Sequence, residues 1–362
     1  MNWNSHVEVI AWAEKQPWAA AMLQCQQDPE WHSEGNVWIH TGMVINELIK
    51  SPTYQALSAD EKKVMLASAL LHDCGKPATT VLEGTRIRSP GHSRAGARLA
   101  RQILREIDFP LQDRERVINL IYSHGWPPHV INVDEPEMEV IRASWLCRNE
   151  LLHLLSLSDM RGRIGSEKTN YSFDAVDLWR DVAMQYNCLT EPYATTQEGK
   201  VQAFDGKDIR FHKPHENFQC TMTLLSGVPG SGKDTWIKKH RKDQPMVSLD
   251  GIRLDLDVDP TDNQGHVVNE AKEQVRIHLR AKQSFVFNAT NITKEIRGRW
   301  IRLARDYNAK VEVIYIEPPV ATILAQNKNR DATVPESVIL RLLEKTEVPN
   351  AGEAHEVSLL AS

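Results

Sequence analysis

The sequence lacks the features of a membrane-spanning chain, a disulfide-linked secreted protein or a highly basic nucleic-acid-binding protein. No stretch of its 362 residues approaches the roughly 18 consecutive apolar residues that a membrane span needs. The first residues carry Glu8 and Glu14 and no basic cap before an apolar core, so we expect no secretory signal. The five cysteines are scattered without a CxxC pair, which is typical of reduced thiols in a cytoplasmic protein and excludes a disulfide framework. A net charge of −5 gives no bulk attraction for polynucleotides, so any such contact must be local.

What is present is an ordinary globular composition, 41% hydrophobic and 25% charged, in a chain long enough for two domains. From Trp38 to about Asn187 the apolar residues recur at helical spacing, with a short ribbon near 79–87 as the exception. From residue 218 onward, short β-rich runs alternate with helical stretches, which favours a parallel sheet with helices on both faces. We therefore expect an all-α domain over 1–189, a linker over 190–217 and an α/β domain over 218–362.

A glycine-rich segment with the GxxxxGK spacing follows the first expected strand of the second domain. Its glycines allow backbone N–H groups to surround a phosphate, and its lysine reaches the terminal phosphates of a nucleoside triphosphate. The residue after the lysine is Asp234 where a Ser or Thr is usual, so magnesium could be held by Asp234, by Thr235 or through water. The candidate nucleotide-binding residues are Gly227, Gly230, Ser231, Gly232, Lys233, Asp234 and Thr235.

Further polar residues follow the next expected strands. Asp250, at the end of the second strand, could take the proton of an attacking hydroxyl, and Arg253 could hold a phosphate of the acceptor. Arg330 is a candidate lid arginine that stabilises the transferred phosphoryl group; Arg341 is a weaker one, because a solvated helix face explains it equally well. The segment 288–291 could position phosphate or metal, or could be a plain strand-to-helix turn.

These motifs resemble those of the phage-type P-loop 5′-OH polynucleotide kinases over residues 218–362. The resemblance implies catalytic roles for Lys233, Asp250, Arg253 and Arg330, with ATP or another NTP and Mg²⁺ as cofactors. It departs at Asp234, which leaves the direct magnesium ligand open.

The first domain carries six potential metal ligands at the ends of, or on, separate expected helices. Imidazole and carboxylate groups bind divalent ions such as Mn, Fe, Co, Ni and Zn. Four of the six could converge on one ion while Asp73 bridges to a second, and such a pair would generate a hydroxide and clamp a phosphate oxygen. The six are His40, His72, Asp73, His92, His124 and Asp159.

This order of ligands resembles the HD superfamily of metal-dependent phosphohydrolases over residues 28–165. The segments 28–41 and 91–97 resemble the subset found beside tRNA-processing nucleotidyltransferases. Lys76 and Arg94 are candidates to neutralise the substrate phosphate, with Asp73 as the central catalytic ligand. Three residues are weaker candidates for the rim of the site: His32, Glu34 and His129.

An HD domain followed by a P-loop kinase resembles the bacterial HD-Pnk family of RNA end-healing enzymes. The resemblance implies NTP-dependent phosphorylation of 5′-OH ends and removal of a 2′-phosphate, with 3′- and 2′,3′-cyclic phosphates as alternatives. It also implies two divalent transition metals in the HD site and RNA ends as the substrate. DNA ends, a separate RNA ligase and a second copy of the chain stay open as partners.

Three rival interpretations remain at this stage. The chain could be a nucleoside or small-metabolite kinase fused to a nucleotidase, which tests with free nucleosides would reveal. It could be a nucleotide-sensing HD regulator, in which case no turnover would be seen in the parent protein. It could also be an interaction scaffold with relic sites, a view that the complete ligand sets oppose.

Overall fold

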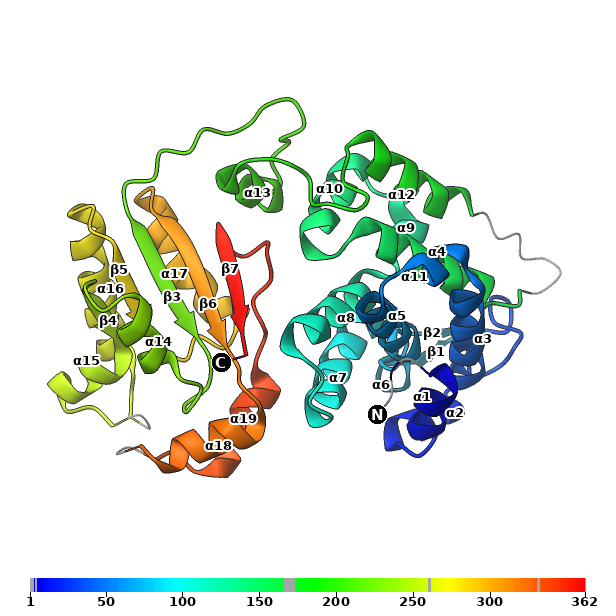
Figure 1. The fold of residues 1–362 in the computed structure, drawn as a ribbon, viewed down its shortest axis with the longest axis horizontal. Coiled ribbons are helices and arrows are strands. Elements are labelled where there is room, and N and C mark those ends of the chain that lie inside the picture. Colours follow the sequence, from blue (N-terminus) through cyan, green and yellow to red (C-terminus); the bar gives the residue numbers. More distant parts are fainter. Residues whose placement is uncertain (1–2, 4, 166–172, 260–261, 331–332, 362) are drawn as a thin grey trace. The chain divides into compact units, whose positions relative to one another are not determined.

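The computed structural model describes residues 3, 5–165, 173–259, 262–330 and 333–361 (Figure 1). The chain divides into two compact units, Met1–Ala194 and Thr195–Ser362. In the described part of the chain, no helix is both long enough and apolar enough to cross a bilayer.

The first unit is helical and contains one antiparallel ribbon, as the sequence predicts. At its centre is α5, whose residues from Val64 to Leu71 are all buried, the pattern of a helix surrounded by others. A capping box between Ser58 and Glu61 begins this helix. The elements are α1 (His6–Ala13), α2 (Pro17–Gln24), α3 (Val37–Lys50), α4 (Pro52–Ala56), α5 (Ala59–Leu71), α6 (Lys76–Thr79), β1 (Val81–Glu83), β2 (Arg86–Arg88), α7 (His92–Glu106), α8 (Leu111–Ser123), α9 (Trp126–His129), η1 (Val130–Asn132), α10 (Pro136–Leu146), α11 (Asn149–Arg161) and α12 (Asp174–Gln185).

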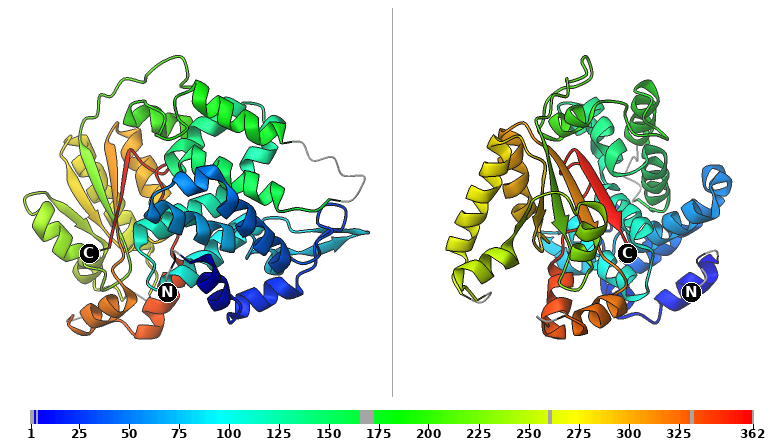
Figure 2. Two further views of the ribbon diagram at one scale, coloured as in Figure 1. Left: turned by 45° about the vertical axis from the view of Figure 1, so that its right-hand side comes forward. Right: turned by 60° about the vertical axis from the view of Figure 1, so that its left-hand side comes forward.

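The second unit is built on a five-stranded parallel sheet in the order β4-β5-β3-β6-β7. Figure 2 shows its strands side by side from two further directions. The elements are α13 (Gln197–Phe204), β3 (Thr221–Ser226), α14 (Lys233–His240), β4 (Met246–Ser248), α15 (Leu249–Leu256), α16 (Gly265–Arg280), β5 (Phe285–Asn288), α17 (Lys294–Asp306), β6 (Lys310–Ile316), α18 (Val320–Lys328), α19 (Glu336–Lys345) and β7 (Glu356–Leu360).

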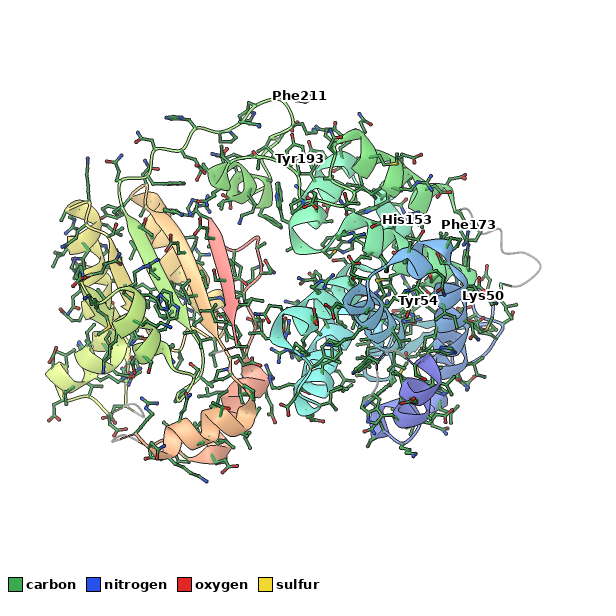
Figure 3. The ribbon with its side chains drawn as sticks, in the orientation of Figure 1. Lys50, Tyr54, His153, Phe173, Tyr193 and Phe211 are labelled. Atoms are coloured by element: carbon green, nitrogen blue, oxygen red, sulfur yellow. The ribbon has the colours of Figure 1, made fainter. Side chains whose placement is uncertain are left out.

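Alternate residues of the strands face opposite layers of this unit. On one face Met222 and Leu224 pack with α16 and α17, and on the other Leu225 packs with Ile237 of α14. The α/β architecture with helices on both faces is therefore confirmed. Between α13 and β3, residues 205–220 form neither helix nor strand, and Phe211 there is 84% exposed (Figure 3).

The parallel strands place their carboxyl ends at one edge of the sheet. The central strand β3 is where the strand order reverses, because β4 and β5 lie on one side of it and β6 and β7 on the other. Ligands of open α/β sheets bind at such a point. The glycine-rich segment 227–233 begins directly after β3, so the fold places it there.

Candidate active sites

Six metal-ligand side chains of the first unit come together. Two groups of potential ligand atoms share Asp73, one with His40 and His72 and one with His92 and His124; within each group the atoms lie within 4.8 Å of one another. Asp159 joins the first group, with its Oδ1 2.9 Å from His40 Nε2. The structure thus brings together the residues that the sequence suggested for two ions, with Asp73 in the bridging place.

Three of the four histidines have their ring fixed by the main-chain carbonyl three residues earlier in the chain. The Nδ1 atoms of His72, His92 and His124 lie 2.8, 2.8 and 2.7 Å from the carbonyl oxygens of the residues three positions earlier. An N–H donated by Nδ1 leaves the Nε2 lone pair free for a metal. Burial, followed by the charge of His72, lowers the pKa of His124 to about 4, so its imidazole is neutral at pH 7.

The two carboxylates of the site stay ionised despite full burial. Burial raises the pKa of Asp73, but Lys76, 2.7 Å away, and His72 outweigh it and hold that pKa well below its usual value. Burial also raises the pKa of Asp159, but Arg163 and His40 outweigh this effect and hold that pKa well below its usual value. The site therefore presents two negative charges inside a ring of imidazoles.

The residues fit divalent ions. The Nε2 atom of His72 and the Oδ1 atom of Asp73 are buried and have no hydrogen-bond partner. Such orphaned polar atoms are costly unless an ion or water satisfies them. His, Asp and a bridging carboxylate are a normal donor set for transition metals.

Of the remaining candidates of this unit, only some lie at the metal ligands. Lys76 is 9% exposed and also donates to Gln27, so it lies at the site but is already engaged by protein groups. Arg94 and His129 are exposed. Arg163, which the sequence analysis missed, donates to both carboxylate oxygens of Asp159; its position four residues later was the available signal.

The glycine-rich loop of the second unit requires glycine for its shape. Gly227, Gly230 and Gly232 have φ angles of +148°, +81° and +96°, and a Cβ on Gly230 would lie 2.7 Å from the carbonyl oxygen of Ile323. Gly232 caps α14, and the Ser231 hydroxyl is buried without a hydrogen-bond partner. The loop is thus a preformed cradle that ends at a helix N-terminus.

The ammonium group of Lys233 lies over this loop. Its Nζ donates to the carbonyls of Gly227 at 2.7 Å and Val228 at 3.0 Å. Burial lowers the pKa of Lys233 to about 8, with Asp234 opposing this effect and Arg330 adding to it. Because the positive charge of Arg330 acts on Lys233, Arg330 lies near the loop.

One contact orients a candidate magnesium ligand, Asp234. Asn288, at the end of β5 and 8% exposed, donates from Nδ2 to Asp234 Oδ1 at 2.7 Å, while its own Oδ1 has no partner. Thr235 is exposed. Asn291 has a structural role, because its side chain donates to the Leu225 carbonyl and its φ is +45°.

The two residues that the sequence suggested for the acceptor form a charged pair on α15. Asp250 lies in the first turn of α15, with its side chain 81% exposed, and pairs with Arg253. Arg253 also donates to Gln264 at 2.7 Å. Arg341 is exposed on α19, in keeping with a solvated helix face.

Comparison with known proteins supports both units. Residues 40–134 match the family model of the HD domain, and residues 222–349 match that of an AAA domain. The chain is 23% identical to L-seryl-tRNA(Sec) kinase of Methanococcus maripaludis, over 38% of this chain and 56% of that protein. It is 24% identical to heterogeneous nuclear ribonucleoprotein U-like protein 2 of Mus musculus, over 36% of this chain and 20% of that protein. The chain thus spans about half or less of the length of these curated relatives.

A solved structure, that of the Pnkp1/Rnl/Hen1 RNA repair complex, matches 36% of this chain and 45% of its own chain at 18% identity, with a TM-score of 0.33. The two domain matches fall on the two sites described above. The chain joins an HD domain to a P-loop, kinase-like AAA domain, the combination predicted from its resemblance to the HD-Pnk family.

Proposed function

We propose that the chain is a bifunctional RNA end-healing enzyme of the cytoplasm. Its kinase half, residues 218–362, would phosphorylate 5′-OH ends, and its HD half, residues 1–189, would remove a 2′-phosphate. The observation that supports the proposal is that six potential metal ligands gather in one unit of the chain, and a preformed glycine-rich loop with its lysine lies in the other. The products, a 5′-phosphate and a free 2′,3′-diol, are ends that a separate RNA ligase can seal.

In the kinase half, each residue around the loop has a separate role in phosphoryl transfer. Asp250, exposed beside the loop, accepts the proton of the attacking hydroxyl, and Arg253 holds the first phosphate of the RNA strand. Lys233 and Arg330 neutralise charge on the transferred group. We assign the magnesium contact to Asp234, oriented by Asn288; the ion supplies charge neutralisation of the phosphates.

In the HD half, the six ligands would hold two divalent ions, which would supply Lewis acidity toward water and phosphate oxygens. Lys76 and Arg163 add positive charge beside the carboxylates. Arg94, exposed two residues after His92, is available to a phosphate that enters from solvent. These groups favour a dianionic phosphomonoester as the substrate.

The P-loop relative lends independent support to an RNA acceptor. The M. maripaludis protein is named as a kinase of L-seryl-tRNA(Sec), an RNA-linked substrate. A protein similar to part of this chain is therefore named for kinase action on an RNA-bound acceptor.

A single labelled substrate tests the proposal. An RNA strand with a 5′-OH and a 2′-phosphate is incubated with NTP and divalent metals, with free nucleosides as competing acceptors. Lys233→Ala should abolish 5′ phosphorylation and spare 2′-phosphate removal, whereas Asp73→Ala should do the reverse. Preferential phosphorylation of nucleosides, or no turnover in the parent protein, would replace this function with one of its rivals.

A further inference from the structure

His40 differs from the other three histidines of the metal site in how its ring is held. It lies inside α3, where the carbonyl three residues earlier, that of Val37, already accepts a hydrogen bond from the Thr41 hydroxyl at 2.9 Å. The other three lie at helix ends, where the carbonyl three positions earlier is available. The His40 Nδ1 atom must therefore find its acceptor outside its own helix.

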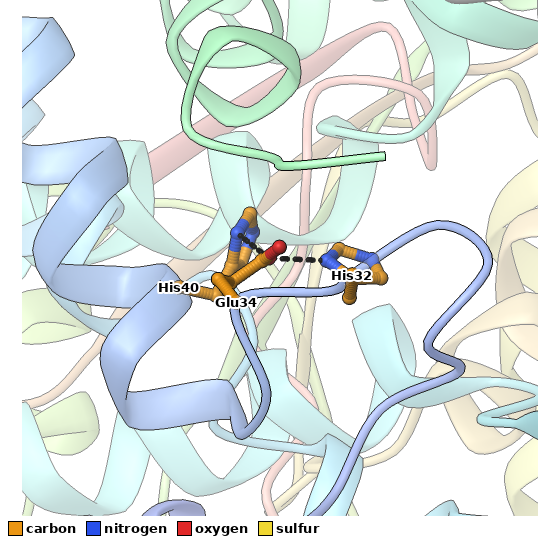
Figure 4. Close-up of side chains that lie close together, drawn as sticks. All are labelled: His32, Glu34 and His40. Atoms are coloured by element: carbon orange, nitrogen blue, oxygen red, sulfur yellow. Dashed lines mark hydrogen bonds and ion pairs between the residues drawn. The ribbon is translucent and has the colours of Figure 1, made fainter. Parts of the chain in front are cut away.

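That acceptor is Glu34, together with the Gly162 carbonyl. Glu34 Oε1 lies 3.1 Å from His40 Nδ1 and 2.7 Å from His32 Nδ1, so one carboxylate oxygen contacts both imidazole rings (Figure 4). On the opposite side of the His40 ring, Nε2 faces Asp159 at 2.9 Å and Asp73 at 3.8 Å. Glu34 thus lies directly behind a metal-binding nitrogen.

Glu34 is itself fixed by the surrounding chain. Its other oxygen, Oε2, accepts from the Ile164 amide at 2.9 Å, and the Ile164 carbonyl accepts from both the amide and the hydroxyl of Ser33 at 2.7 Å. These bonds join the loop before α3 to the segment after α11. That segment follows Asp159 and includes Arg163. The same hydrogen bonds therefore position His40 and Asp159, which are more than 100 residues apart in the chain.

We propose that Glu34 is a positioning residue of the metal centre, with His32 as its outer partner. The inference rests on the proposed metal site of the HD domain. A carboxylate behind a metal-binding imidazole fixes the ring and increases the electron donation of its Nε2 atom, and loss of such a group typically lowers metal affinity about 10- to 100-fold. Glu34 therefore determines how tightly the ion next to His40 and Asp159 is bound.

The same three residues could instead hold an ion of their own, since their ligand atoms are also close together. Hydrogen bonds of 2.7 and 3.1 Å already account for their positions. The only His40 nitrogen facing Glu34 is Nδ1, and it is shared with the Gly162 carbonyl at 3.2 Å. The geometry favours a chain of hydrogen bonds running from His32 to the metal ligand.

The test is a Co²⁺ titration of the full-length apoprotein, followed by visible absorption and calorimetry. The wild type should bind two equivalents. Glu34→Gln, which keeps the size of the side chain, should weaken one equivalent about 10- to 100-fold, change its absorption band and leave the other equivalent unaffected. Glu47→Gln, on α3 in a surface ion pair with Lys50, is the matched control and should leave the affinity of both Co²⁺ equivalents unchanged.

A second variant keeps the test decisive if Glu34→Gln is unstable. His32→Gln should weaken the same equivalent by a smaller factor, and it should have no further effect when combined with Glu34→Gln. Melting temperatures of the apoproteins identify a purely structural role, which would lower them without changing Co²⁺ affinity. If Glu34→Gln binds both Co²⁺ equivalents as tightly as the wild type, the role of Glu34 is refuted while the metal site stands. The same holds if the wild type binds a third Co²⁺ equivalent that His32→Gln loses. A wild type that binds no Co²⁺ overturns the metal site itself.

Discussion

The lowered pKa of Lys233 predicts how nucleotide binding depends on pH. In the free protein, burial brings this pKa from its ordinary 10.5 to about 8. Phosphate groups of a bound nucleotide add negative charge beside the ammonium, so the pKa of Lys233 rises in the complex. Binding is therefore coupled to proton uptake at pH values between the two pKa values, and affinity should fall as pH increases above about 8.

The size of the effect follows from the fraction of protonated lysine. At pH 7 nearly all of Lys233 is charged, whereas at pH 9 only about one tenth is charged in the free protein. Nucleotide affinity should then be about tenfold weaker at pH 9 than at pH 7, which corresponds to about 1.4 kcal/mol of binding free energy.

The assay is calorimetry of ATP binding from pH 7 to 9.5 in buffers of different ionisation enthalpy. Proton uptake per site should approach one near pH 9. Lys233→Met should bind weakly at every pH, with no proton uptake above pH 8. Affinity of the wild type that stays constant up to pH 9.5 would refute the link between burial of this ammonium and phosphate binding.

Three further predictions concern single side chains. Asp73→Asn should abolish binding of both divalent ions, because Asp73 belongs to both ligand groups, whereas Asp159→Asn should weaken only one; Co²⁺ titration separates the two results. Arg297→Met should lower the free energy of unfolding by about 3–5 kcal/mol in urea titrations, since it leaves Glu353 buried and unpaired; a loss below 1 kcal/mol would contradict this. Gly230→Ala should weaken ATP binding and lower the melting temperature, because its φ of +81° and a contact at 2.7 Å oppose a Cβ; an unchanged ATP affinity would show that the loop can adjust.

The parts of the fold that could be predicted are those with a local signal. Helical spacing and the alternation of strands and helices identified both architectures, and the ribbon near 79–87 is present as β1 and β2. Two N-terminal helices were not assigned, although Ser5 followed by Glu8 is an N-terminal helix signal that could have located α1. The strand β7 was also missed, because Glu356–Leu360 is short and only half-buried, so its apolar pattern is weak.

The candidate metal ligands could be named from the sequence because an adjacent His72-Asp73 pair is combined with four further imidazoles and carboxylates in the order that resembles the HD superfamily. The partners of their supporting groups could not be named in the same way. Glu34, suggested by the sequence as a weaker rim candidate, acts through a contact between the loop before α3 and the segment after α11, which only tertiary structure brings together. The segment 288–291 was also suggested, but the contact of Asn288 with Asp234 joins the end of β5 to the first turn of α14 and has no local signal. Arg163 was missed although it lies only four residues after its partner Asp159.

The two sites differ in the charge that their protein groups present to a phosphate. The loop of the second unit offers backbone N–H groups and cations, so a triphosphate can bind there directly, as its neighbouring Lys233 and Arg330 indicate. The site of the first unit contains two buried carboxylates whose pKa values are held low, and each is already paired with one cation, so its protein groups alone attract a phosphate dianion weakly. Divalent ions would add the missing positive charge. Phosphohydrolase activity and the stability of the first unit should therefore decline together when metal is removed, while ATP binding by the second unit remains.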